Sequence, residues 1–210
     1  MTQIIEHFAP FIEPTFKFDL ETLKNEIQRG MVGIGKAYET LKGNYLVDDS
    51  EINPEDAYLQ AVAEMAYCYG VKGKLEPPCA LVAEYDAAYL DLSLFCKLSR
   101  SAEELGHGSL SISAENVFAM CILRSRLDAS LGRQIPEAVV LENDEELFTL
   151  KEVAILAQMH EKSVRNATQP TANDRLETIK VGKRTYVTAK VADDWLSRRR
   201  SFQPTISADS

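Results

Sequence analysis

The sequence contains few of the residues that catalytic and metal sites require. Its four cysteines, Cys68, Cys79, Cys96 and Cys121, form no C-x-x-C pair, and no histidine stands at the spacing of a metal ligand. No nucleophile-elbow, zinc-protease or dinucleotide-binding signature occurs. We therefore expect no catalytic activity, no metal and no cofactor.

Long hydrophobic runs are also absent. No window approaches the roughly 18 consecutive apolar residues that a membrane helix needs. The first ten residues, MTQIIEHFAP, lack the basic stretch and the long apolar run of a signal peptide. The cysteines stand among tyrosine, leucine and methionine, where a free thiol behaves as a small apolar side chain. These features predict a cytoplasmic protein that does not contact membranes.

Two fragments resemble chemical motifs but lack necessary parts. The stretch GMVGIGKA (residues 30–37) matches G-x-x-x-x-G-K, yet Ala37 stands where a nucleotide-binding loop needs a hydroxyl for magnesium. A buried strand should also precede such a loop, whereas the preceding LETLKNEIQR has the pattern of a polar helix. Glu104 and His107 have the E-x-x-H spacing of di-iron bundles, but no second copy exists. We expect neither fragment to bind a ligand, and we expect His107 in a solvated loop.

Charge divides the chain into two parts of opposite sign. Residues 147–204 hold 11 of the 23 basic residues and 6 of the 32 acidic ones, a net charge of +5. The remainder holds the other 12 basic and 26 acidic residues, a net charge of −14. Such asymmetry indicates a nucleic-acid-binding module joined to a segment with a different role.

The first two-thirds of the chain has the helix start and stop signals of an all-α domain. Asp19 can cap a helix with apolar residues at helical spacing, and Gly30 is placed to end it. Ser113 can cap a later helix that stops at Gly132. Comparable patterns between them predict about five helices, packed as a bundle.

The basic third begins with two short helices. Thr149 and Glu152 form a T-x-x-E capping box directly before an apolar run, which predicts a helix ending near Met159. Residues 160–168 can form a second helix whose Val164 faces inward. Two short helices joined by so brief a turn pack at a steep angle, as in motifs that place the second helix in a major groove.

A glycine-centred hairpin follows the helix pair. Residues 176–188 contain two β-rich runs around Gly182, with Lys183 and Arg184 at the tip. This is the shape of a wing that grips a nucleic-acid backbone. A closing helix over residues 190–199 carries Trp195, which can pack on the hairpin and on the first helix.

Taken in order, these segments resemble a known family. The stretches TLKEVAIL, KSV, IKVGKRTYV and DWL, starting at Thr149, Lys162, Ile179 and Asp194, are similar to the excisionase and MerR-type winged helix-turn-helix. The resemblance covers residues 147–200, about a quarter of the chain. It implies a DNA-binding module whose recognition helix starts near His160.

Three features depart from that family pattern. Gln158 stands where the turn usually has glycine, and His160 replaces a serine-like cap. The insertion QPTAND (residues 169–174) lengthens the connection to the wing. These departures affect the turn that aims the recognition helix.

Roles on DNA follow from the side-chain chemistry. Lys162 and Arg165 can donate to guanine, Asn166 can pair with adenine, and Ser163 can reach a base or a phosphate. Glu161 is expected to accept from a cytosine amine or to point aside. The wing cations would contact phosphates, which position the protein without specifying sequence. The residues expected at the DNA are Lys162, Ser163, Arg165, Asn166, Lys180, Lys183, Arg184 and Tyr186. Arg198, Arg199 and Arg200 either reach phosphates or only favour the C-terminal dipole of their helix.

These inferences define a fold and two functional hypotheses. We predict a mainly α protein with an acidic helical domain over residues 1–145, a winged helix-turn-helix over 146–202 and a disordered tail over 203–210. The first hypothesis is a transcriptional regulator or recombination accessory factor that binds double-stranded DNA. Its helical domain would form a homodimer or bind a protein partner. The alternative is a non-enzymatic adaptor that uses the winged domain as a protein-interaction surface. A third possibility, an enzyme in the bundle, is supported by no set of candidate catalytic residues.

Overall fold

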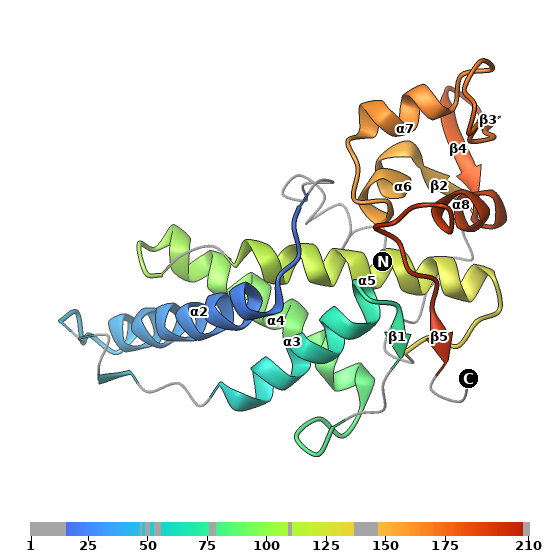
Figure 1. The fold of residues 1–210 in the computed structure, drawn as a ribbon. Coiled ribbons are helices and arrows are strands. Elements are labelled where there is room, and N and C mark those ends of the chain that lie inside the picture. The colour runs from blue at the N-terminus through green and yellow to red at the C-terminus, as the bar shows by residue number, and fades with distance from the viewer. Residues whose placement is uncertain are drawn as a thin grey trace.

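The computed structural model of this chain describes residues 16–46, 48, 51–52, 56–75, 79–108, 111–136 and 147–207. The fold is mainly α-helical, as the sequence predicts, with a helical bundle followed by a winged helix-turn-helix and its short hairpin (Figure 1). The elements in chain order are α2 (Leu20–Leu41), α3 (Ala57–Gly70), β1 (Lys74–Leu75), α4 (Tyr85–Glu104), α5 (Ile112–Ser130), β2 (Leu147–Thr149), α6 (Leu150–Leu156), α7 (Glu161–Ala167), β3 (Ile179–Val181), β4 (Arg184–Thr188), α8 (Ala189–Leu196) and β5 (Ile206–Ser207).

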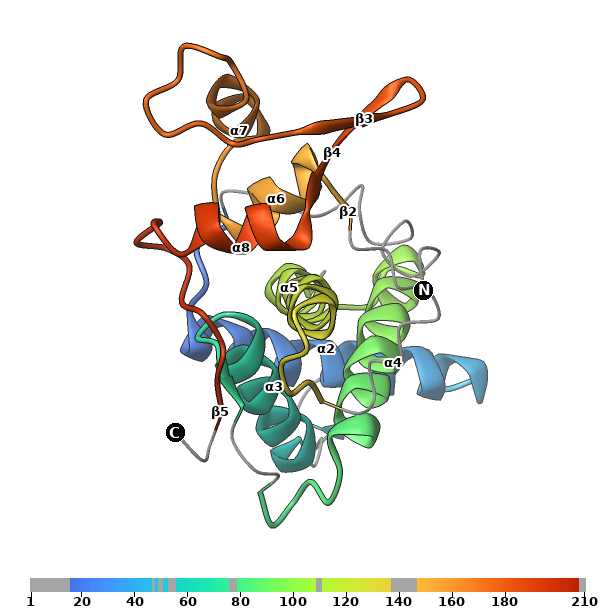
Figure 2. The same cartoon turned by 90° about the vertical axis from the view of Figure 1, so that its right-hand side faces the viewer.

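The chain forms a body and a winged head. We define the body as residues 16–136, which include α2 to α5, and the head as residues 147–202. The described part of the body has four helices, where the sequence indicates about five. Helix α5 lies between the head and the other body helices (Figures 1 and 2).

Helix α2 continues through the glycine that was expected to end it. The Asp19 carboxylate accepts from the Thr22 amide at 2.8 Å and caps the helix as predicted. Gly30 lies in the middle of α2, where an added Cβ would stand 2.6 Å from Phe95 Cζ. The missing side chain therefore lets α2 approach α4 closely. The G-x-x-x-x-G-K stretch is part of this helix and forms no phosphate-binding loop.

Helix α5 is buried along most of its length, including its charged residues. Ser111, and not Ser113 as predicted, occupies the N-cap position. The Ser113 amide instead donates to Glu26 Oε2 of α2 at 2.7 Å. Buried Glu115 accepts from Arg100 of α4, with Nη2 and Oε2 2.5 Å apart. Each of these groups is paired, because an unpaired buried charge would strongly destabilise the fold.

The head is built on a three-stranded antiparallel sheet of order β2-β4-β3. The predicted hairpin pairs Lys180 with Thr185, and its turn places Gly182 at φ +61°. Strand β2 is an addition that the sequence did not indicate, and it pairs Phe148 with Val187. Both of these side chains are buried, as is the Trp195 side chain of α8. The third strand therefore joins the wing to the start of the helix pair.

The body and the head pack against each other through one continuous core. At its edge, Arg126 of α5 donates from Nη1 to Glu152 Oε1 of α6 at 2.8 Å. Arg133 forms two hydrogen bonds with the Asp193 carboxylate of α8, at 2.9 and 2.6 Å. The expected domain boundary at residue 145 lies in the stretch 137–146, outside the described residues.

The segment expected to be a disordered tail is partly ordered, so that prediction is wrong for residues 203–207. Strand β5 runs parallel to β1 of the body, with Ile206 opposite Lys74. Arg124 Nη1 donates to the Gln203 carbonyl at 2.7 Å, and Thr205 Oγ1 donates to Asp128 Oδ2 at 2.6 Å. Buried polar groups of α5 thus hold the segment in place. Residues 208–210 lie outside the described part of the chain.

Candidate nucleic-acid interface

The candidate interface is built on the helix pair α6 and α7. The capping box forms as predicted, with Glu152 N donating to Thr149 Oγ1 at 3.2 Å and Thr149 N donating to Glu152 Oε2 at 2.7 Å. His160 precedes α7 in an extended conformation, and its side chain makes no capping hydrogen bond. Buried Val164 fixes the inner face of α7 against the head core.

The turn between the helices has an unusual backbone at the position where glycine is common. Gln158 has φ +50°, the one positive φ of a non-glycine residue in the described parts of the chain. Its side chain compensates in part, because Nε2 donates to the Ser201 carbonyl at 3.2 Å. A non-glycine residue in this region costs about 1–3 kcal/mol, so the turn stores some strain.

The strain predicts a specific order of stability among variants at this turn. Gln158→Val and Gln158→Asn both remove the bond to Ser201, but asparagine tolerates positive φ whereas a β-branched residue does not. We expect Gln158→Val to have a free energy of unfolding about 2 kcal/mol lower than Gln158→Asn. Urea denaturation measures both. Equal stabilities would mean that the turn does not require the left-handed conformation.

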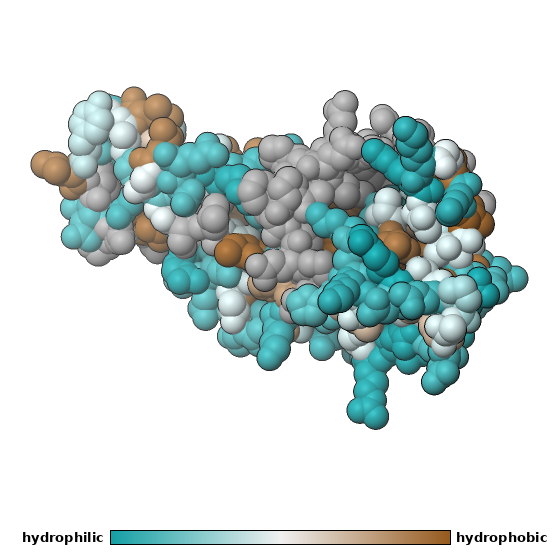
Figure 3. Space-filling model, turned by 90° about the horizontal axis from the view of Figure 1, so that it is seen from above, coloured by the Kyte–Doolittle hydropathy of each residue, from teal (hydrophilic) through white to brown (hydrophobic). Residues whose placement is uncertain are grey.

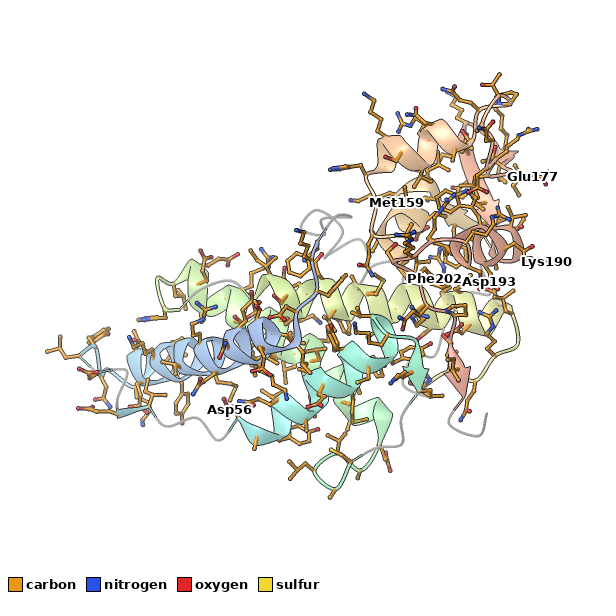
Figure 4. The ribbon with its side chains drawn as sticks, viewed as in Figure 1. Asp56, Met159, Glu177, Lys190, Asp193 and Phe202 are labelled. Atoms are coloured by element: carbon orange, nitrogen blue, oxygen red, sulfur yellow. The ribbon has the colours of Figure 1, made fainter. Side chains whose placement is uncertain are left out.

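The outward face of α7 holds the predicted base-reading residues. Lys162, Ser163, Arg165 and Asn166 are all exposed. Glu161 points at one of them: Arg165 Nη2 donates to Glu161 Oε1 at 2.6 Å, and 68% of the arginine side chain is exposed. Figure 4 shows nitrogen-tipped side chains projecting from α7 away from the body. Glu161 therefore orients and partly neutralises Arg165.

The wing presents cations on both faces of the hairpin. Lys180, Lys183 and Arg184 are exposed, and Tyr186 is half-buried. Side chains of directly opposed residues share one face of a sheet, and successive residues alternate. The register therefore places Lys180 on the face of Thr185, whereas Arg184 lies on the opposite face with Tyr186. The sequence predicted these cations as one set and did not distinguish the faces.

A hollow of about 560 Å³ lies between the two helices and the wing. It brings together Arg165 of α7 and Arg184 of β4, which are 19 residues apart in sequence. Its lining residues are Thr149, Leu150, Lys151, Glu161, Arg165, Thr168, Arg184 and Thr185. Three cationic side chains and three hydroxyl groups around one concavity suit a phosphate, with Glu161 as the single acid.

Lys151 is a site residue that the sequence reasoning missed. It lines the hollow from the first turn of α6, whereas the capping-box pattern was used only to locate a helix start. Its position inside the box, in the first turn of α6, could have identified it, because this end of a helix carries positive partial charge and favours anions such as phosphate. Thr168 and Thr185 line the hollow because α7 and β4 lie side by side there. Local sequence patterns do not encode that tertiary arrangement.

The arginines after α8 have mainly a structural environment. Arg198 forms an ion pair with Asp174, with Nη2 2.9 Å from Oδ1, and Arg199 pairs with the other oxygen of the same carboxylate. The Arg199 guanidinium also stacks 3.8 Å from the centre of the Trp195 ring. Asp174 is the last residue of the QPTAND insertion, so these pairs tie the insertion to α8. This environment favours a structural role for the two arginines over a direct DNA contact.

The described part of the body shows no comparable candidate site. Among the described residues, no group of three or more His, Cys, Asp and Glu side chains could hold a metal. His107, expected in solvent, is partly buried and lies with Nε2 3.2 Å from Thr40 Oγ1. Burial raises the pKa of the Cys121 thiol to about 12, which disfavours a reactive thiolate. Within the same residues, no helix is both long and apolar enough to cross a bilayer.

The site is therefore defined by its own geometry: the short helix α7 with a polar outer face, a basic hairpin and a hollow between them. Comparisons of the chain with protein-family models, with curated proteins and with solved structures returned no match.

Proposed function

We propose that the protein binds double-stranded DNA through its winged head, as a transcriptional regulator or a recombination accessory factor without catalysis of its own. One observation carries this proposal: Arg165 of α7 and Arg184 of the wing line one hollow, and the other cations expected at the DNA on α7 and the wing are exposed and not covered by the described part of the body. Burial of Arg165, Lys183 and Arg184 against the body would instead have favoured an autoinhibited state or an adaptor.

The exposed residues suggest how the head would engage a duplex. Helix α7 would enter the major groove, where Arg165 and Lys162 donate to guanine and Asn166 pairs with adenine. A phosphate would occupy the hollow, in reach of Lys151 and Arg184. Lys180 and Lys183 would contact the backbone beside the groove, and Tyr186 would approach it from the face of the wing that carries Arg184.

A protein-interaction role is the second candidate, and one feature of the wing favours it. Ile179 and Val181 of the edge strand β3 are 42% and 51% exposed. An apolar edge strand can accept a strand from another protein. Under this alternative the head would bind a partner and its affinity for DNA would be low.

Salt dependence distinguishes the two functions. Binding of the full chain to random duplex fragments is measured by fluorescence anisotropy at several salt concentrations. Phosphate contacts from Lys151, Lys180, Lys183 and Arg184 predict a slope of about −4 for log K against log salt, because each contact contributes about −0.9. A slope near zero, or no binding at low salt, would overturn the DNA proposal.

The pairing of Glu161 with Arg165 gives a second expected result. Glu161→Gln removes a carboxylate that competes with DNA for Arg165. Since exposed pairs of this kind contribute up to about 1 kcal/mol, we expect duplex affinity to rise about threefold to fivefold. Asp194→Asn is the matched control, because it removes one exposed acid from the head without touching Arg165. An equal rise in both variants would assign the effect to net charge alone.

A further inference from the structure

The last described residues of the chain cross from the head to the body. We call residues 201–207 the C-terminal strap. It begins beside the turn between α6 and α7 and ends in β5, which pairs with β1 of the body (Figures 1 and 2). Between these ends, Phe202 is 4% exposed, and the Arg124 guanidinium of α5 lies 4.7 Å from the centre of its ring. The strap therefore contacts both parts of the molecule.

At its head end, the strap binds the turn that joins α6 to α7. The Ser201 hydroxyl donates to the Ala157 carbonyl at 2.6 Å, and the Ser201 carbonyl accepts from Gln158 Nε2 at 3.2 Å. Ala157 is the C-cap of α6, where backbone carbonyls have no partner within the helix. Gln158 is the residue with positive φ. Ser201 thus holds the two residues at which the chain changes direction between the helices.

Helix α7 depends on such contacts for its direction. Seven residues are too few for an independently stable helix. Its inner face is held by buried Val164, and its C-terminal end by the Leu176 amide, which donates to the Ala167 carbonyl at 2.8 Å. At the N-terminal end, the His160 side chain makes no capping hydrogen bond. The turn bound by Ser201 therefore fixes this end of α7.

At its body end, the strap is held by hydrogen bonds and by a close backbone approach. Arg124 donates to the Gln203 carbonyl, and the Ile206 amide donates to the Gly73 carbonyl at 2.9 Å. Gly73 has φ +67°, and a Cβ added to it would stand 2.6 Å from the Gln203 oxygen and 2.8 Å from the Pro204 oxygen. The missing side chain lets the body and the strap approach this closely.

We propose that the C-terminal strap positions α7 for DNA recognition: Ser201 sets the direction of the helix, and the body fixes Ser201 through the rest of the strap. This inference rests on the proposed function, because the direction of α7 determines whether Arg165 and Asn166 reach base edges. The wing would contact phosphates from β3 and β4, and such contacts carry no sequence information. Loosening the strap should therefore lower selectivity among sequences more than it lowers the number of phosphate contacts.

Two substitutions loosen the strap at opposite ends. Gly73→Ala lies in the body and forces two strap carbonyls away from it, without touching the head. Ser201→Ala removes the hydroxyl that binds Ala157, whereas Ser201→Thr keeps a hydroxyl at the same place. Because the two ends are changed separately, Ser201→Ala decides the question even if Gly73→Ala does not fold.

Gly43→Ala is the matched control. Gly43 also has a positive φ, +90°, but a Cβ added to it would meet no atom within 4 Å. It follows α2 beside Leu41 and Tyr45, which are 81% and 77% exposed. Figure 3 shows hydrophobic residues at the end of the molecule that lies farthest from the head. The control therefore introduces alanine at positive φ without a contact to the strap.

Hydrogen exchange of the full chain without DNA tests the positioning. The amides of residues 158 and 159 donate to carbonyls of α6 and report the order of the turn. We expect them to exchange about tenfold faster in Gly73→Ala and in Ser201→Ala, as for the loss of one hydrogen bond. In Gly43→Ala and Ser201→Thr they should exchange at the parent rate. Thermal melts show which variants fold.

Three results would overturn the proposal. The first is a strap that exchanges faster in Gly73→Ala while the turn keeps the parent rate. The second is an equal increase at the turn in Gly43→Ala, which would assign the effect to general destabilisation. The third is a turn in Ser201→Ala that exchanges like the parent, which would show that the hydroxyl does not hold it.

DNA binding separates this inference from the proposed function. The probes are a duplex enriched from a random pool by the parent protein and unselected random fragments. We expect Gly73→Ala to lower the ratio of the two affinities roughly tenfold, the contribution of one base contact, with an unchanged salt slope. A turn that loosens in a protein without affinity for DNA would reject the proposed function and leave the strap standing. Unchanged selectivity in Gly73→Ala, with the expected salt slope, would do the reverse.

Discussion

Replacing both Lys183 and Arg184 with alanine is expected to weaken duplex binding about a hundredfold at low salt. Each residue is exposed on the wing, and each would donate to a phosphate. A hydrogen bond to a charged group contributes about 1.5 kcal/mol at the low end of its range, so two contribute about 3 kcal/mol. Since about 1.4 kcal/mol corresponds to a factor of ten, the loss reaches about two orders of magnitude.

The salt titration should report the same two contacts independently. The slope of log K against log salt should fall in magnitude by about 1.8, because two phosphate contacts are lost. The matched control is Lys72→Ala with Lys74→Ala, which removes two exposed charges from the body. We expect the control to bind like the parent. A control that loses as much affinity as the wing variant would show that net charge, and not the wing, determines binding.

The head could be predicted from sequence because its signals are local. The capping box at Thr149 and Glu152 and the glycine turn at Gly182 each lie within a few residues of the element they define. The helix pair and hairpin therefore appear where they were predicted, to within about three residues. The four residues of α7 expected at the DNA, Lys162, Ser163, Arg165 and Asn166, are exposed, because buried Val164 fixes the inner face of the helix.

The contacts that unite the molecule could not be predicted, because their partners are distant in sequence. Gly30 reads locally as a helix end, yet close packing against Phe95 explains it. The ordering of residues 203–207 depends on buried groups of α5 that lie more than 70 residues earlier. Glu152 was predicted as a capping residue alone, whereas its other oxygen accepts from Arg126 of the body. The start of the helix pair is thereby tied to α5.

The junction of α5 with the C-terminal segment holds two buried charges, Arg124 and Asp128. Arg124 is 1% exposed, and its Nε donates to the Gly70 carbonyl at 2.9 Å. The Asp128 carboxylate, one turn later, accepts from the Tyr69 hydroxyl at 3.0 Å and from Thr205. Burial raises the pKa of Asp128, and the neighbouring Arg124 guanidinium opposes that rise. Arg133 Nη1 also lies 3.3 Å from Asp128 Oδ1, so two cations together offset the cost of burying this carboxylate.

Arg124→Met is expected to lower the free energy of unfolding by about 3–5 kcal/mol at neutral pH. The substitution keeps a long apolar stem but leaves the Gly70 and Gln203 carbonyls without their donor. It also removes a nearby positive charge from the Asp128 carboxylate, which keeps its ion pair with Arg133. For a chain of this length the loss corresponds to a fall in Tm of about 10 °C. The matched control is Arg198→Met, whose side chain is 54% exposed, and which should change stability by less than about 1 kcal/mol.

The pH dependence of this loss identifies its cause. Because the folded-state pKa of Asp128 is raised above its unfolded value, the stability it contributes is present below the unfolded pKa and disappears as pH rises through the folded pKa. Removing Arg124 raises that pKa further, so the penalty of Arg124→Met should shrink as the solution is acidified and Asp128 gains a proton. The double variant Arg124→Met with Asp128→Asn should lose this pH dependence and be more stable at neutral pH than the two single effects predict by addition. A penalty that is constant with pH and strictly additive would instead attribute the loss to packing and to the unpaired carbonyls alone.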